Sequence, residues 1–322
     1  MKEPLYRDAL RHSWHFAWHN KMLWSLGLFA GALGQMGLFD FFGYITWAAS
    51  EPRLMPLWWR LPSVLPSLWG QLSHRVDVVV WLIWLLVSLI GLAGFLIFFA
   101  VAGQGTVIAA AAQSARGRSV SLGAAWVNGV KHFWRLLFLN LIRKSVILLL
   151  GVSLSWAALN AFFSVTSADL LIFVLVFLLV VFVGVWLSIV TIYAAGYIIV
   201  EEYPLPDAIS AAWLLFSEHW LVSLEIAAIL LFFQTVAGLL AVVGIIFFFF
   251  PAVFVWQAGV TFLSPTLFLA GHLFGLATFL SFILLVGALY TLFATATWTY
   301  LFMKMHRHGV VSRILHFARG RL

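Results

Sequence analysis

The chain has 322 residues, of which 64% are hydrophobic and only 9% charged, with a formal net charge of +7 and no cysteine. A soluble globular protein carries roughly a quarter charged residues, so this composition excludes that class. The lack of cysteine excludes disulfides and thiolate-based catalytic or metal sites. The basic residues flank apolar stretches, which is typical of membrane orientation signals and not of nucleic-acid binding, so we expect no nucleic-acid partner.

Continuous apolar runs predict an all-α membrane protein, because a helix of about 20 apolar residues crosses a bilayer. A membrane β-barrel would instead show short segments of alternating polarity. Several of the predicted spans are longer than a bilayer requires, so we expect tilted helices or helices that extend beyond the hydrocarbon. In chain order, the six predicted transmembrane helices cover residues 22–39, 78–102, 136–163, 170–200, 221–250 and 273–302.

Lysine and arginine predict the orientation of the chain. Six spans place both termini on one side, and fifteen of the eighteen Lys and Arg residues fall on that side, leaving only Arg53, Arg60 and Arg75 on the other. Cytoplasmic loops carry the excess of basic residues. We therefore predict a multi-pass protein of the inner (cytoplasmic) cell membrane with both termini in the cytoplasm.

Three similar stretches each precede an odd-numbered span: DALRHSW at 8–14, SLGAAW at 121–126 and DAISAAWLLFSEHW at 207–220. Aligned on Trp14, Trp126 and Trp213, they share apolar or small residues at helical spacing and a polar residue five positions later. Each stretch predicts a short amphipathic helix at the cytoplasmic interface, with its Trp at the level of the headgroups. Trp220 is a further expected anchor.

One interfacial helix followed by two spans would form a unit used three times within a single transmembrane domain, residues 1–322. The alternative is that surface helices recur because every span needs an anchor. The third copy differs by being acidic, so we expect a basic partner near it, or pairing with the basic surface of the other units. The predicted units cover about 5–112, 119–200 and 207–304, followed by a basic tail at 305–322, and the acidic residues are Glu201, Glu202, Asp207 and Glu218.

The segment VEEYPLPDAISAAWLLFSEHW at 200–220 carries an acidic pair at the end of a span, two prolines in a short turn, and then Ala208 and Trp213. Together with SLGAAWVNGVKHFWRLLFLNLI at 121–142, it resembles bacterial six-helix integral membrane proteins of unknown function. These are similar to the membrane domain associated with glycerophosphodiester phosphodiesterases. The resemblance implies fold and location. Phosphodiesterase activity would require a separate soluble barrel, and spans and short loops account for all 322 residues, so we expect no enzyme.

Charged residues inside predicted spans require a reason, because a charge at mid-bilayer costs about 2.5–3.5 kcal/mol on insertion scales. Arg143 and Lys144 lie in the third span and Glu225 in the fifth. The long basic side chains can reach the interface. Glu225 is shorter, and we predict that it faces the bundle interior and is paired, with Arg143 or Lys144 as candidate partners. Such a pair could be structural or could line an ion or substrate path.

Uncharged polar residues and glycines within the spans predict helix packing. Amides in a bundle usually form hydrogen bonds between helices. Gly27 and Gly31, one helical turn apart, predict a close approach of two helices. The amides concerned are Gln35, Gln104, Asn140, Asn160 and Gln234.

Asp8, His12, His15 and His19 fall on about one face of the first predicted surface helix. Histidines spaced i and i+4 can share a metal, and a carboxylate can complete the site. The face could also sense pH, or it could simply be the hydrated cytosolic side of the helix, which we favour. We predict no catalytic residue, no cofactor and no metal.

The function predicted from these features is that of a non-catalytic integral membrane protein, an accessory or scaffold component of the cell envelope or of a membrane complex. Its expected partners are membrane lipids and other membrane proteins. The alternative is a transporter or lipid-handling protein with a polar path near Glu225 and Arg143.

Overall fold

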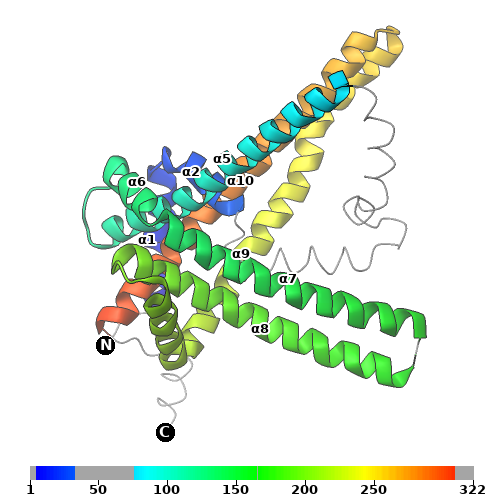
Figure 1. Ribbon diagram of the computed structural model, residues 1–322. Coiled ribbons are helices and arrows are strands. Elements are labelled where there is room, and N and C mark those ends of the chain that lie inside the picture. Colours follow the sequence, from blue (N-terminus) through cyan, green and yellow to red (C-terminus); the bar gives the residue numbers. More distant parts are fainter. Residues whose placement is uncertain (1–4, 33–75, 165, 309–322) are drawn as a thin grey trace. The chain divides into compact units, whose positions relative to one another are not determined.

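The computed structural model describes residues 5–32, 76–164 and 166–308, and every regular element in these ranges is an α-helix (Figure 1). The all-α prediction is therefore confirmed for this part of the chain. The helices are α1 (Leu5–His19), α2 (Leu23–Ala32), α5 (Val76–Ala115), α6 (Leu122–Lys131), α7 (Phe133–Ser164), α8 (Ser167–Val200), α9 (Leu205–Thr261) and α10 (Pro265–His308).

Five helices, α5, α7, α8, α9 and α10, are long and apolar enough to cross a membrane. The chain is thus an all-helical protein of the multi-pass membrane class. The predicted spans at 136–163 and 170–200 agree closely with α7 and α8. The first predicted span, 22–39, continues past Ala32, where the described residues stop, so a sixth membrane helix at this position stays a prediction. The predicted tail at 305–322 also lies largely outside the described residues.

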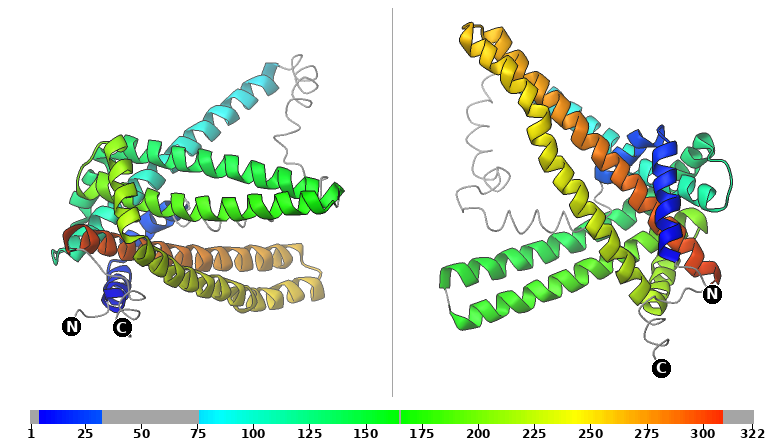
Figure 2. Two further views of the ribbon diagram at one scale, coloured as in Figure 1. Left: turned by 90° about the horizontal axis from the view of Figure 1, so that it is seen from below. Right: turned by 180° about the vertical axis from the view of Figure 1, so that it is seen from behind.

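The last two helices extend beyond the predicted spans at 221–250 and 273–302. Helix α9 continues through Pro251 to Thr261, and α10 already begins at Pro265. A short turn joins them into an antiparallel hairpin (Figure 2). Close packing explains the extension, because a Cβ on Gly259 would lie only 2.5 Å from the Phe268 backbone nitrogen. The two backbones touch, and each helix supports the apolar continuation of the other.

The chain divides into two compact units. The first comprises residues 1–35, 100–140 and 189–322, and the second comprises 36–99 and 141–188. In the second unit, the parts of α7 and α8 lie side by side in both views (Figures 1 and 2). The start of α8 is capped by Thr166, whose hydroxyl accepts the Asp169 N–H and bonds the Asp169 carboxylate. The polar network and the pocket described below both lie in the first unit.

In the first unit, the three predicted surface stretches form α1, α6 and the beginning of α9. Each buries the small residue that directly precedes its Trp. Ser13, Ala125 and Ala212 are all fully buried. The buried edge of each helix is thus one position away from the predicted Trp stripe, and the Trp residues lie at its margin.

Each of these three helices breaks six residues after its Trp. Helix α1 stops before Asn20, α6 before His132, and α9 has a non-helical residue at His219 (φ −126°, ψ 28°). The expectation of a separate third surface helix is corrected accordingly, because it continues into the span through a kink. At each break a side-chain nitrogen lies near the carbonyl four residues earlier, 2.9 Å from that of Phe16, 3.0 Å from that of Asn128 and 3.3 Å from that of Leu215.

Helices α5 and α6 cross at backbone contact in the first unit. A Cβ on Gly105 would lie 2.9 Å from the Gly129 Cα. At the same crossing, the Thr106 hydroxyl bonds within its own helix, to the Ala102 carbonyl over 2.7 Å. Similarly, α2 lies against α10, where a Cβ on Gly27 would lie 2.8 Å from Leu292 Cγ. The predicted close approach of helices at the Gly27 turn is confirmed.

Gly129→Ala should destabilise the protein, whereas Gly123→Ala on the same helix should not. A Cβ at 129 would lie 2.6 Å from the Ala102 carbonyl oxygen and 2.7 Å from the Thr106 nitrogen, and these backbone atoms cannot swing away. We expect a loss of about 1–3 kcal/mol, typical of overpacking, measured by thermal unfolding in detergent. Nothing lies within 4 Å of a Cβ at 123, so that variant should match or slightly exceed the wild type. Equal midpoints for the two variants would contradict a backbone contact.

Candidate functional site

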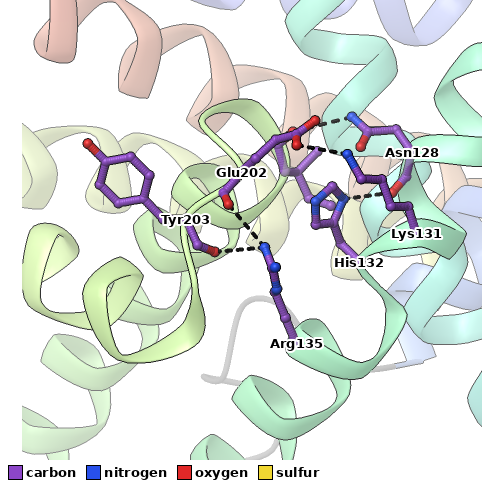
Figure 3. A network of polar contacts seen from close by, with 7 residues as sticks. Asn128, Lys131, His132, Arg135, Glu202 and Tyr203 are labelled. Carbon is purple, nitrogen blue, oxygen red and sulfur yellow. Dashed lines mark hydrogen bonds and ion pairs between the residues drawn. The ribbon is translucent and has the colours of Figure 1, made fainter.

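A polar network joins the α6–α7 corner to the turn between α8 and α9 (Figure 3). Lys131 Nζ lies 2.7 Å from Glu202 Oε2 and forms an ion pair with it. Arg135 donates from Nη1 to the carbonyls of Glu202 (3.0 Å) and Tyr203 (3.2 Å). The Asn128 amide donates to the last turn of α8 over 3.2 Å. Three side chains of the α6–α7 corner therefore hold the end of α8 and the turn that follows it.

Glu202 occupies a position where glycine is usual. Its φ of 59° is left-handed, a conformation that favours glycine after a helix. Glycine would adopt this conformation more easily, but only a side chain such as glutamate can form the ion pair with Lys131. The hydrogen bond from Lys131, followed by its charge, lowers the pKa of Glu202 below its usual value. The acidic third stretch was predicted to pair with basic residues of another sequence repeat. The ion pair of Glu202 with Lys131, a residue of the second predicted repeat, confirms this prediction at Glu202.

The contacts of this network fix the position of the backbone. Lys131 and Glu202 are more than half exposed, and the two Arg135 contacts go to backbone carbonyls. A general acid or base would need a shifted pKa near neutrality and a space for a substrate beside it. The lowered pKa of Glu202 moves in the opposite direction. The arrangement fixes the point at which the chain leaves α8 and starts α9.

The second polar cluster is the α1–α10 pocket, an open cavity of about 550 Å³ at the surface of the first unit. All four residues of the predicted histidine face line this pocket. The remaining lining residues come from α1 and α10 and were not part of the predicted face. Its lining consists of Asp8, Arg11, His12, Trp14, His15, Trp18, His19 and Tyr300.

The histidines of this pocket have different surroundings. His12 is half-buried, lies 3.2 Å from the Ser114 hydroxyl, and stacks near Tyr300 with ring centroids 5.1 Å apart. Burial, and then the charge of His15, lowers the pKa of His12. The expectation that this whole face is hydrated is therefore wrong at His12. His15 and His19 are exposed, and their rings lie 3.7 Å apart.

The structure gives no support to a metal site on this face. Within the described residues, no group of three or more His, Asp or Glu side chains is placed to hold an ion. His19 directs its Nδ1 to the His15 carbonyl at 3.0 Å. This local contact leaves Nε2 as the ring nitrogen of His19 that faces outward.

The predicted interfacial anchors are largely exposed. Trp14, Trp213 and Trp220 are each about half exposed, and Trp126 is partly buried. Trp14 stacks on Trp18 with centroids 6.0 Å apart. Exposed tryptophans beside a membrane span are typical of the headgroup level.

The charged residues of the predicted spans separate into two kinds. Arg143 is 1% exposed although its neighbour Lys144 is exposed. Glu225 is half-buried and takes part in a polar or electrostatic interaction. The pairing of Glu225 with Arg143 or Lys144 stays a prediction.

Uncharged polar side chains inside the first unit bond across helices, as predicted. The Asn140 amide donates to Gln104 Oε1 over 2.7 Å, and both residues are buried. The Tyr290 hydroxyl donates to a carbonyl of α9 over 3.1 Å and lies 3.5 Å from Gln234 Oε1. Asn160 bonds within its own helix, and Gln35 lies outside the described residues. These bonds join α5 to α7 and α9 to α10.

Sequence reasoning missed the residues that close the helix breaks and the aromatic wall of the pocket. A signal for the breaks was present, because a hydrogen-bonding side chain stands six positions after each aligned Trp. No comparable signal identifies Tyr300, which reaches His12 only through the packing of α1 on α10.

No protein-family model, curated protein or solved structure matches the chain. The resemblance to six-helix membrane proteins therefore stays a prediction, and a function has to be argued from the geometry of the chain itself.

Glu202→Gln and Glu202→Gly should separate the ion pair from the backbone conformation. Both variants lose the Lys131 ion pair, but glycine also relieves the left-handed φ. We expect Gln to lower the thermal midpoint and Gly to recover part of that loss. Because the pKa of Glu202 is lowered from 4.5, the ion pair stabilises the protein above this pH and is lost as the pH falls through the lowered value. The difference between wild type and Gln should thus shrink in acid, and a constant difference would contradict the assignment.

Proposed function

We propose that the chain is a non-catalytic protein of the inner membrane, with six spans and both termini in the cytoplasm, acting as an accessory or scaffold component of a membrane complex. The observation that supports this proposal most directly is the use of polar groups as internal connections. Lys131, Arg135 and Glu202 fix a turn, and Asn140 with Gln104 joins two helices. Polar side chains that bond to other parts of the same chain fix the fold, and a fixed surface is what a protein partner can bind.

The threefold repeat belongs to the same proposal. It is supported by two regularities, the fully buried small residue before each Trp and the break six residues after it. Surface helices recruited independently would need an apolar face, but they would not need a side-chain nitrogen directed at the carbonyl four residues earlier in all three breaks. Descent of the three units from one ancestor accounts for both regularities.

Purification from the native membrane in mild detergent should yield a stable stoichiometric protein partner. Asp207 and Glu218, the exposed acidic residues of the third copy, would attract a partner with a basic surface. Asp207→Lys with Glu218→Lys should therefore release it, whereas the matched reversal Arg116→Glu with Arg118→Glu should not. Quantitative mass spectrometry of the eluates measures the result. Isolation of the wild type alone, with one enriched lipid class, would contradict the scaffold role.

A transporter or lipid-handling protein is the second candidate, because Arg143 is buried within a span. Charged residues inside membrane spans commonly mark ion or substrate pathways. Glu225, half-buried in its own span, is a second charged residue of this kind.

Proteoliposomes test this alternative with two readouts, an entrapped pH-sensitive dye for protons and a fluorescent phospholipid for lipid movement between leaflets. The transporter role requires wild-type flux above that of protein-free liposomes, and Glu225→Gln should reduce it roughly tenfold, as expected for loss of a charged contact worth about 1.5–3 kcal/mol. Glu218→Gln, which removes an exposed carboxylate of the same helix, is the control. Wild-type liposomes that behave like empty ones in both assays would contradict transport of protons and lipids.

A further inference from the structure

The α1–α10 pocket collects the groups that proteins use to hold a phosphate. Arg11 contributes a permanent positive charge and a planar fork of N–H donors, a geometry that matches phosphate oxygens. His15 and His19 add two exposed imidazoles with rings 3.7 Å apart. Lys304 lies next to the wall of the pocket, with Nζ 5.7 Å from the Tyr300 ring centroid. The pocket thus concentrates cationic groups around a cavity large enough for a headgroup.

His12 forms part of the wall of the pocket and is not one of the anion-binding groups. Its ring contacts Ser114 and Tyr300, so it ties the pocket to helices α5 and α10. Burial, and then the charge of His15, lowers the pKa of His12 and so favours its neutral form. The groups left to bind an anion are Arg11, His15 and His19.

The rim of the pocket indicates where the anion comes from. Trp14 is 58% exposed and Trp18 48% exposed, and Met22 continues the apolar edge of the same segment. A free phosphate makes no use of an exposed aromatic rim. A phospholipid does, since tryptophan sits at the headgroup level with its ring against the glycerol and the first methylenes.

We propose that the α1–α10 pocket binds the phosphate of a membrane phospholipid headgroup, held by Arg11, His15 and His19, with Trp14 and Trp18 against the lipid's glycerol region. The site requires that the chain lies in a membrane, but it does not depend on the scaffold role. Failure of one proposal therefore leaves the other standing.

Hydrogen-bond chemistry makes this site stronger in acid. His19 Nδ1 lies 3.0 Å from the His15 carbonyl, so it donates there, and the ring then presents an N–H at Nε2 only when it is protonated. Asp8 also lines the pocket and cancels the charge of Arg11 while the imidazoles are neutral. Protonation of His15 or His19 gives the pocket a net positive charge. Tyr300 and Lys304 are the ionisable groups that α10 brings to the pocket.

The test uses the full-length chain in a non-ionic detergent, titrated with phosphatidylglycerol and followed by native mass spectrometry, which counts bound lipids. The wild type should bind one lipid more tightly at about pH 6 than at about pH 8, the range in which histidine titrates. Arg11→Gln should weaken binding about tenfold, the loss of one charge-assisted contact. Arg7→Gln is the matched control, because Arg7 is an exposed residue of the same helix outside the pocket lining.

Each outcome decides one part of the proposal. Equal weakening by Arg7→Gln and Arg11→Gln would indicate diffuse charge and overturn the site. His15→Gln with His19→Gln should abolish the pH dependence, and persistence of that dependence would overturn the role of the imidazoles. Inorganic phosphate that displaces the lipid at equal concentration would overturn the lipid assignment in favour of a free anion. Unchanged elution and thermal midpoints establish that the variants fold, and a variant that fails this control is replaced by Arg11→Lys, which keeps the charge but loses the fork and should also bind less tightly.

Discussion

A helix that lies along a membrane surface and then crosses the bilayer has to break, and the break frees carbonyls in a place where little water can reach them. An unsatisfied carbonyl at such a depth costs several kcal/mol. This chain meets the constraint three times in the same way. Asn20, His132 and His219 each direct a side-chain nitrogen back to the carbonyl four residues earlier, which adds a polar contact to the turn where the helix breaks. Helices α2 and α7 and the later part of α9 each start from one of these corners.

The polar interior follows the same logic at longer range. In an apolar environment an amide or hydroxyl that finds a partner on another helix contributes to association, typically about 0.6–2 kcal/mol. Asn140 with Gln104 and Tyr193 with Ser223 are such pairs, each at 2.7 Å. Glycine at the crossing points lets the backbones come close enough for these short side chains to meet. Packing and polar pairing therefore depend on each other throughout the first unit.

The class of the protein and most of its long helices could be predicted from the sequence, because a continuous apolar run leaves few alternatives to a membrane helix. The ends of α9 and α10 could not. Pro251 reads as the end of a span, yet α9 continues past it because the glycine-lined contact with α10 supports both helices. The pocket was only half predictable. The histidine face follows from helical spacing, but the burial of His12 depends on Ser114 and Tyr300, which no local pattern connects to it.

The packing of α1 on α10 has a consequence for the order of assembly. The ring of His12 meets that of Tyr300, which the ribosome adds about 290 residues later, or about 15–60 s at typical rates of synthesis. The crossing of α5 and α6 at Gly129, by contrast, joins neighbours in the chain and can form early. During that interval α1 can contact α5 through His12 and Ser114 but lacks its main partner, α10. Because Tyr300 of α10 lines the pocket, the pocket can form only after α10 has been synthesised and has packed against α1.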